Sequence, residues 1–208
     1  MSGRSRRLIS EPADPRDSQF IPLAVAGEAG LALLAVGLGR VVGVSPLAQL
    51  QPSWRSFLWG VLATPPLVLA LVWVLKRPDG RLRRLVDFVV GQLGPILAGR
   101  STAELALVAA LAGLGEELMF RGVVQAGLAW LVPNPLALLS ASVLFGLAHF
   151  ATSTYAVVAG VMWLYLGGLF LVQGSLLAPI VTHALYDLVA LLLVVQRYRA
   201  SQAGPAVA

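Results

Sequence analysis

The chain has 208 residues, of which 58% are hydrophobic and only 12% charged, and its mean hydropathy is +0.82. This composition excludes an ordinary soluble domain, in which about a quarter of the residues are charged, and predicts an integral membrane protein. The absence of cysteine excludes disulfides and thiolate chemistry. The net charge of +5 indicates no nucleic-acid partner, because fourteen of the fifteen basic residues lie at the termini or between apolar runs.

The first segment, residues 1–19, is polar and contains four arginines, and we expect it to be a disordered cytoplasmic leader. Apolar runs follow at 20–39 and 57–75, and each is long enough to cross a hydrocarbon core of about 30 Å. The basic cluster that comes next predicts, by the positive-inside rule, a cytoplasmic loop and a cytoplasmic N-terminus. This cluster consists of Lys76, Arg77, Arg81, Arg83 and Arg84.

Residues 85–99 are ambiguous, because Asp87, Gln92 and Pro95 interrupt a short apolar run. We favour an interfacial or re-entrant helix there over a full crossing. The long apolar stretch 102–131 predicts one long or kinked helix. Further apolar runs follow at 136–150, 155–173 and 175–195.

The predicted fold is all-α, a polytopic membrane helix bundle with about six transmembrane helices, or seven if residues 85–99 cross. After the leader, we divide the chain into 20–100 (spans, basic loop and interfacial segment), 101–196 (a helical core with the polar motifs) and 197–208 (a short polar tail). Six crossings place both termini on the cytoplasmic side of what we expect to be a prokaryotic plasma membrane. The oligomeric state stays open, because small residues allow close helix contacts within or between subunits.

Three polar clusters interrupt the apolar runs of the 101–196 region. Inserting a charged side chain at the centre of a membrane helix costs about 2.5 to 3.5 kcal/mol of free energy. Pairing or hydration of these residues must offset that cost. The clusters are Glu116-Glu117 with Arg121, Phe145 with His149, and His183 with Asp187.

Residues four apart share one face of a helix, which predicts an ion pair as the main role of Glu117 and Arg121. Glu116 is rotated by about 100° from Glu117 and has no basic partner at helical spacing, so it is a candidate general base. Asp187 shares a face with His183, and it can fix the histidine tautomer, orient the ring or join it as a metal ligand.

A single membrane histidine is equally well explained by a hydrogen bond between helices. The helices that carry His149 and His183 are predicted to run in the same direction, however, with the two rings at similar depths. We therefore expect them to share one cavity. Glu28 and Glu104 are isolated and nearer segment ends, and we interpret them as interfacial residues without a functional role.

These clusters resemble the three signature motifs of the CPBP family of intramembrane proteases, also called Abi, which includes the type II CAAX prenyl endopeptidases. The matching segments are EELMFRG at 116–122, FGLAH at 145–149 and SLLAPIVTHALYD at 175–187, in the family's order and with typical spacing. The resemblance implies an endopeptidase that hydrolyses a peptide bond of a membrane-associated or lipid-modified protein or peptide.

By this resemblance, Glu116 and His149 would activate the attacking water. His183 and Asp187 would bind the carbonyl oxygen or hold the site in shape. The family commonly has asparagine at the position of Asp187, and because an ionised aspartate cannot donate to an oxyanion, an orienting or ligating role is favoured here. The supporting residues would be Glu117, Arg121 and Phe145.

The residues leave open whether the enzyme is of the glutamic or the metallo type. Glu116, His149 and His183 are an acceptable ligand set for a divalent metal such as zinc, yet they can also activate water unaided, and we favour the metal-independent alternative. A different class of function would be a non-proteolytic membrane scaffold or a proton- or ion-coupled transporter that uses the same buried cluster. A third interpretation gives the polar residues only a role in helix association.

Overall fold

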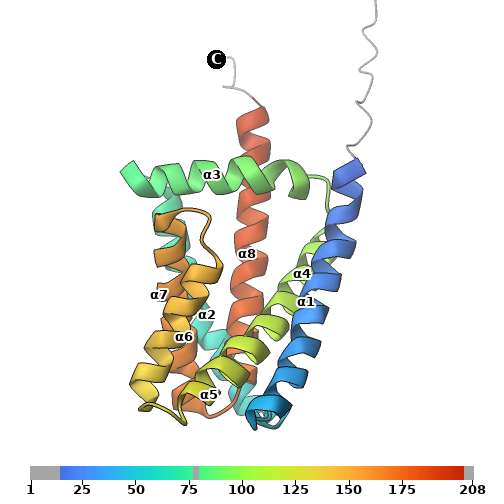
Figure 1. The fold of residues 1–208 in the computed structure, drawn as a ribbon. Helices are drawn as coiled ribbons and strands as arrows, with labels where there is room; N and C mark the ends of the chain where they lie inside the picture. The colour runs from blue at the N-terminus through green and yellow to red at the C-terminus, as the bar shows by residue number, and fades with distance from the viewer. Residues whose placement is uncertain (1–14, 77–79, 204–208) are drawn as a thin grey trace, which may run out of the picture.

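The computed structural model describes residues 15–76 and 80–203, with side chains from residue 19 onwards. Every regular element in these ranges is a helix, which confirms the all-α prediction. Most long helices run along a common direction in Figure 1, and α3 (Gly80–Leu97) lies across one end of them. The other main helices are α1 (Pro15–Val42), α2 (Trp54–Lys76), α4 (Thr102–Met119), α6 (Asn134–Ala148), α7 (Ser153–Gln173) and α8 (Leu177–Gln202).

Four described helices are long and apolar enough to cross a membrane, namely α1 from Gln19 onwards, α2, α7 and α8. Helix α6 is apolar, but its 15 residues span only about 22 Å, short of a hydrocarbon core of about 30 Å. Helix α4 carries the acids Glu104, Glu116 and Glu117 and is not among the four. The described residues therefore indicate an integral membrane protein, while the expected count of six crossings is not confirmed.

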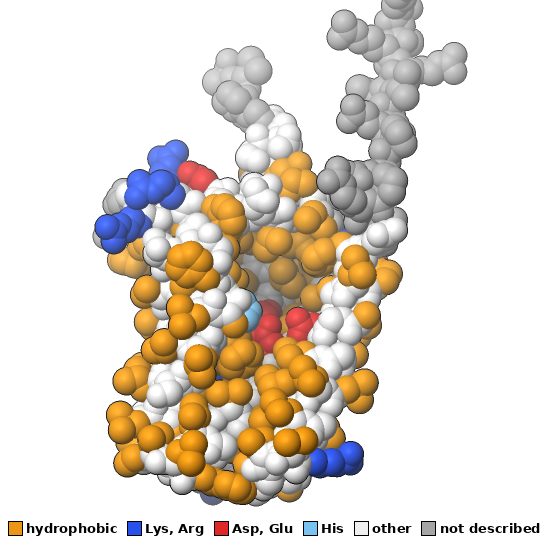
Figure 2. Space-filling model, in the orientation of Figure 1, with side chains coloured by type: hydrophobic (Ala, Val, Ile, Leu, Met, Phe, Trp, Pro, Cys, Tyr) orange, Lys and Arg blue, Asp and Glu red, His pale blue; other side chains and the backbone are white. Residues whose placement is uncertain are grey.

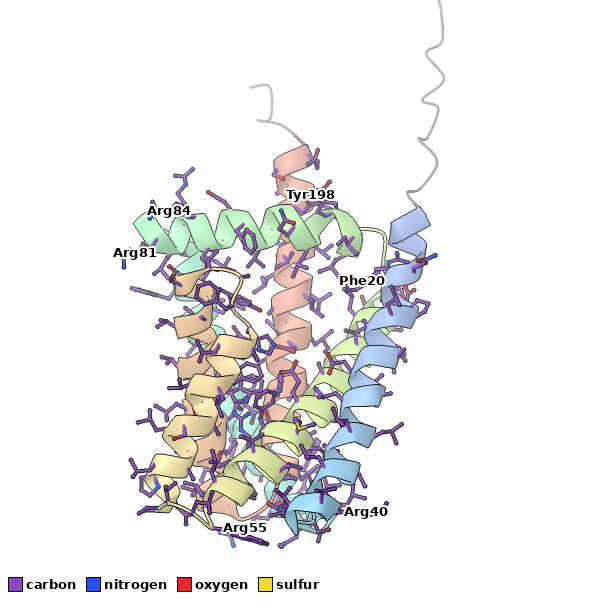
Figure 3. All side chains as sticks on the ribbon, viewed as in Figure 1. Phe20, Arg40, Arg55, Arg81, Arg84 and Tyr198 are labelled. Atoms are coloured by element: carbon purple, nitrogen blue, oxygen red, sulfur yellow. The ribbon has the colours of Figure 1, made fainter. Side chains whose placement is uncertain are left out.

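Helix α3 takes the position expected of an interfacial helix. It lies across the direction of the other helices in Figure 1, and it is not one of the four candidate spans. Arg81 and Arg84 extend from its outer end in Figure 3, whereas Leu85 and Leu97 are buried. An amphipathic helix of this kind rests on the membrane surface rather than crossing it. The arrangement agrees with the interfacial alternative for residues 85–99.

The end of α8 holds α3 in place. Arg199 Nη2 donates a hydrogen bond of 2.6 Å to the carbonyl oxygen of Ala98, and Arg197 donates to a carbonyl at the end of α2. The ring of Tyr198 packs against Gly94, where an added Cβ would lie 2.6 Å from the ring. The segment that we expected to be a polar tail therefore begins as the last turns of α8.

The ends of the described ranges bear on three predictions. Helix α1 begins at Pro15, so the last residues of the predicted leader, 1–19, are helical. Residues 1–14 lie outside the described residues, and the disorder of the leader stays a prediction. Residues 77–79, which include Arg77 of the basic cluster, and residues 204–208 also lie outside them.

Helix α4 packs between α1 and α8, and α8 also contacts α2, α3 and α7. Two glycines allow this close packing. A Cβ at Gly113 would lie 3.0 Å from the carbonyl oxygen of Ile180 in α8, and a Cβ at Gly115 would lie 2.6 Å from the carbonyl oxygen of Glu28 in α1. The helix that carries the acid pair therefore touches both neighbours at backbone distance.

A capping box begins α4. The Ser101 hydroxyl accepts from the Glu104 amide, and the Glu104 carboxylate accepts from the Ser101 amide at 2.8 Å, which lowers the pKa of Glu104. The helix continues through a π-helical segment, Phe120–Gln125, into α5 (Ala126–Leu128). The predicted long or kinked helix over 102–131 is thus one helical run with a widened turn. Such π turns are rare in proteins as a whole, but they often lie at functional sites. This one begins three residues after Glu117.

Candidate active site

A hollow opens on one face of the molecule, between surfaces that are largely apolar. Figure 2 shows acidic side chains and a histidine at its floor. Three of the predicted site residues are partly exposed: Glu116 by 13%, Asp187 by 27% and His149 by 31% of the side chain. The candidate site is therefore accessible from outside the protein, although it lies among apolar helices.

The predicted ion pair between Glu117 and Arg121 is present. Arg121 Nε lies 3.2 Å from Glu117 Oε2, and both side chains are buried. Arg121 Nη2 also donates a hydrogen bond of 2.7 Å to the carbonyl oxygen of Trp163, and its guanidinium carbon lies 4.3 Å from the centre of the Trp163 ring. The charge of Arg121 is thus balanced by a carboxylate, a carbonyl and an aromatic face at once.

The π-helical segment Phe120–Gln125 begins within one helical turn of the two glutamates. The amide of Phe120 donates to the carbonyl oxygens of both Glu116 and Glu117, so the α-helical bonding of α4 extends to the first residue of the π-helical segment. Arg121 lies in this turn and reaches back to Glu117. The sequence spacing of four predicted this pair correctly, but no sequence signal indicated the π turn.

His183 lies between two carboxylates. Its Nδ1 is 3.2 Å from Glu117 Oε1, and its Nε2 is 3.1 Å from Asp187 Oδ2. The ring is buried. Because both neighbours are acceptors when ionised, both contacts are hydrogen bonds only when each ring nitrogen carries a proton. Of the roles considered for Asp187, this geometry matches that of orienting His183.

His149 is the residue that directly follows α6, and Phe145 holds its ring from the preceding turn. The carbonyl oxygen of Phe145 lies 3.1 Å from His149 Nδ1. The two rings stack with 3.9 Å between centroids and 24° between planes, and Phe145 in turn stacks on Trp163. Stacking and the hydrogen bond together restrict the orientation of the imidazole. Phe145 and His149, which were predicted to share a helical face, are therefore in direct contact.

Glu116 brings these groups together. Its Oε1 lies 3.7 Å from His149 Nε2, and its Oε2 lies 3.9 Å from His183 Nε2. The structure thus unites one residue from α4, one from the end of α6 and one from α8 around a single carboxylate. The two histidines share one site, as their similar predicted depths suggested.

Two residues near the site were not recognised in the sequence as parts of it. Trp163 of α7 is buried against Phe145 and Arg121, but a tryptophan in an apolar run carries no signal of its own. Glu28 was interpreted as an interfacial residue, and this interpretation is wrong. It lies in the middle of α1, against Gly115 and within electrostatic range of Glu116 and His183. Its place inside an apolar run was the signal.

The sequence left open whether Glu116, His149 and His183 bind a divalent metal. Among the described residues, no group of three or more histidine, aspartate or glutamate side chains is arranged to hold a metal ion. Both ring nitrogens of His183 face carboxylate oxygens at hydrogen-bonding distance.

Comparison with known proteins gives one match. Residues 98–189 match the family model described as type II CAAX prenyl endopeptidase Rce1-like. The matched segment runs from just before α4 into α8 and includes Glu116, His149 and His183, but it covers slightly less than half of the chain. No curated protein and no solved structure is significantly similar to the chain.

Proposed function

Because residues 98–189 belong to the Rce1-like type II CAAX prenyl endopeptidase family, we propose that the protein is an intramembrane endopeptidase in which Glu116 and His149 activate water. The family supports protease activity in general. The roles of individual residues are argued from the geometry of the site. The substrate would be a membrane-associated or lipid-modified protein or peptide.

The spacing around Glu116 carries the proposal. The separations of 3.7 and 3.9 Å from the two imidazole nitrogens are too long for direct hydrogen bonds. Polar groups at such separations are commonly bridged by water, and the side chains of Glu116 and His149 are both partly exposed. A hydrolytic water between Glu116 and His149 would therefore contact both groups without any rearrangement.

The hydrogen bond of His149 sets the orientation of that water. A carbonyl oxygen only accepts, so the contact with Phe145 places the proton of a neutral imidazole on Nδ1 and leaves a lone pair on Nε2. A water between Nε2 and the Glu116 carboxylate then donates one proton toward each. Its oxygen lone pairs face away from both groups and are free to attack a carbonyl carbon.

The reaction then proceeds by addition and elimination. Glu116 accepts one proton of the water as its oxygen bonds to the carbonyl carbon, and the carbonyl becomes a tetrahedral oxyanion. Collapse of this intermediate breaks the C–N bond, and the protonated Glu116 returns the proton to the leaving nitrogen. The acyl product keeps the hydroxyl and the amine product keeps the proton, so one water is consumed.

His183 is placed to stabilise the oxyanion, and Asp187 to position His183. The Nε2–H of His183 faces Asp187 at 3.1 Å and Glu116 at 3.9 Å, at the edge of the hollow. A donor held in a low-dielectric site stabilises a developing negative charge far better than a donor in water. An ionised Asp187 cannot donate to the oxyanion itself, so we assign it the orienting role.

Glu117 and Arg121 act further from the reacting atoms. Glu117 forms an ion pair with Arg121 on one side and faces His183 Nδ1 on the other. It therefore links the ion pair to the ring that faces the oxyanion. These two residues are positioning residues, which hold His183 rather than touch the substrate.

The orientation in the membrane is a separate proposal. The start of α1, helix α3 and the end of α8 lie at one end of the molecule in Figure 1, and Arg81 and Arg84 lie at that end in Figure 3. This supports a cytoplasmic location for both termini, by the positive-inside rule. Reporter fusions at residues 1 and 208 would both be active on the cytoplasmic side, and activity on opposite sides would contradict the proposal.

The function is tested by comparing membranes that contain the wild-type protein, Glu116→Gln or Glu104→Gln. Glu104 is a matched control, because it is an exposed glutamate of the same helix and glutamine is also accepted in a capping box. New protein termini should appear with the wild type and the control and be absent with Glu116→Gln. Identical termini in all three would contradict the proposal. Loss of proton flux without any change in termini would favour the transporter alternative.

A further inference from the structure

Glu28 is an acid that neither the matched family segment nor the proposed reaction uses. It lies in the middle of α1, where an ionised carboxylate among apolar side chains is costly unless it is paired or hydrated. A Cβ at Gly115 would lie 3.3 Å from Glu28 Oε2, so this oxygen is directed at α4, immediately beside Glu116. The carboxyl group therefore faces the candidate active site.

The surroundings of Glu28 do not satisfy it. Its Oε2 is buried and has no hydrogen-bond partner among the described residues. Buried polar atoms are normally paired, and an unpaired one calls for an explanation such as a ligand. Two further carboxylates, those of Glu116 and Asp187, lie within electrostatic range of Glu28, as do the two histidines.

A charge balance shows what kind of ligand would satisfy it. Arg121 is already paired with Glu117, and the two histidines can offset at most two further carboxylates when both are protonated. When all four carboxyl groups are ionised, one negative charge is left over even with both histidines protonated, and two are left over when His149 is neutral. The four carboxylates at the site are those of Glu28, Glu116, Glu117 and Asp187.

A groove leads away from Glu28 between α1 and α4. It has a volume of about 750 Å³, and its walls are mainly apolar, with residues such as Val36 of α1 and Leu111 and Leu118 of α4. Glu28 lines it together with Arg40, which is twelve residues further along α1 and hence about 18 Å away. An apolar segment fits these walls, and a positive charge fits only the end at Glu28.

We propose that Glu28 binds a positive charge of the substrate, a lysine or arginine side chain near the scissile peptide bond, while the adjoining apolar segment lies in the α1–α4 groove. The inference rests on the proposed protease function. It names a substrate class, namely segments with a basic residue near the scissile bond. An acidic substrate residue at the same position would be repelled by the carboxylates of the site.

The test uses the purified full-length protein in proteoliposomes with a positional-scanning library of fluorogenic peptides anchored by a palmitoyl chain. Each position is fixed in turn as lysine, norleucine or glutamate. For the wild type, lysine should be favoured over norleucine by about tenfold at one position, with glutamate the least favoured. The ratio of lysine to norleucine turnover should fall about tenfold in Glu28→Gln and be partly kept in Glu28→Asp. Glu104→Gln serves as the control and should keep the wild-type ratio.

The outcomes separate this inference from the proposed function. If the wild type cleaves the library without a preference for lysine at any position, the inference is overturned and the protease function stands. The same holds if the preference survives in Glu28→Gln, because a neutral side chain would then suffice. If the wild type cleaves no member of the library, both are overturned. The lysine preference of the wild type is informative even where a variant fails to fold.

Discussion

The polar cluster has an inner and an outer layer, and the two differ in burial and in spacing. The inner layer consists of Glu117, Arg121 and His183, which are buried and lie at 3.2 Å from one another in successive pairs. The outer layer consists of Glu116 and His149, which are partly exposed and 3.7 Å apart. The inner residues pair directly with one another, whereas the separation between the outer residues leaves room for a further group.

This difference separates structural from chemical roles. Buried charges are tolerated only when they are paired, so removing one member of the inner layer leaves its partner uncompensated. The outer residues tolerate substitution better because solvent reaches them, but a reaction needs their free lone pairs. Substitutions in the inner layer should therefore affect folding first, and those in the outer layer should affect catalysis first.

The largest effect on stability is expected for Arg121→Met. It keeps much of the side-chain volume but leaves Glu117 as a buried, unpaired charge, which should lower the free energy of unfolding by about 3 to 5 kcal/mol. Thermal unfolding of the purified protein measures this. The exposed Arg84→Met is the control, with an expected change within about 0.5 kcal/mol.

A double variant tests whether the uncompensated charge is the cause. Adding Glu117→Gln to Arg121→Met removes that charge and keeps an acceptor for His183, so part of the lost stability should return. If the double variant is less stable than Arg121→Met alone, the unpaired charge of Glu117 is not the cause of the lost stability.

His149→Ala addresses the outer layer and should act mainly on catalysis. Loss of a group that contacts the attacking water should lower kcat by about a hundredfold, while the partial exposure of the ring keeps the cost to stability small. Peptide cleavage in proteoliposomes and thermal unfolding of the same preparations check both quantities. Leu147→Ala, an exposed site in the last turn of α6, is the matched control. Activity within threefold of the wild type would remove His149 from the reaction.

The smallest effect is expected for Asp187→Asn, at the boundary of the two layers. The asparagine oxygen can still accept from His183 Nε2, and its amide can donate to the oxyanion, so kcat should stay within about tenfold of the wild type. Asp187→Leu removes both abilities and should be clearly more harmful. Equal losses in the two variants would show that the negative charge of Asp187 is itself required.

Sequence reasoning succeeded where contacts are local or where a motif names the partners. The spacing of four residues predicted the Glu117–Arg121 pair and the shared faces of His149 and His183 with their neighbours. The same spacing could not give the contacts between helices, such as that of Glu117 with His183, since these depend on how α4 and α8 pack. The short, interrupted apolar run at 85–99 favoured an interfacial helix, and the direction of α3 across the other helices agrees with that prediction.

The features that sequence reasoning missed depend on packing between helices, which the pattern of polar and apolar residues does not indicate. Trp163 contacts both Arg121 and Phe145, but it lies in a helix whose residues are mainly apolar. Glu28 approaches the site only because Gly115 lets α1 pack at backbone distance. The expected six crossings are not confirmed, because α6 is short and α4 carries three acids, and neither is among the four candidate spans of the described residues.

The most direct test of the central claim is the kcat of Glu116→Gln for a cleaved substrate, measured together with its thermal unfolding midpoint. Glutamine keeps the size and shape of the side chain but cannot accept the proton of water, so kcat should fall by about 10²- to 10⁴-fold with an unchanged midpoint. A kcat equal to that of the wild type, or one that falls only in proportion to unfolded protein, would contradict the assignment of Glu116 as the general base.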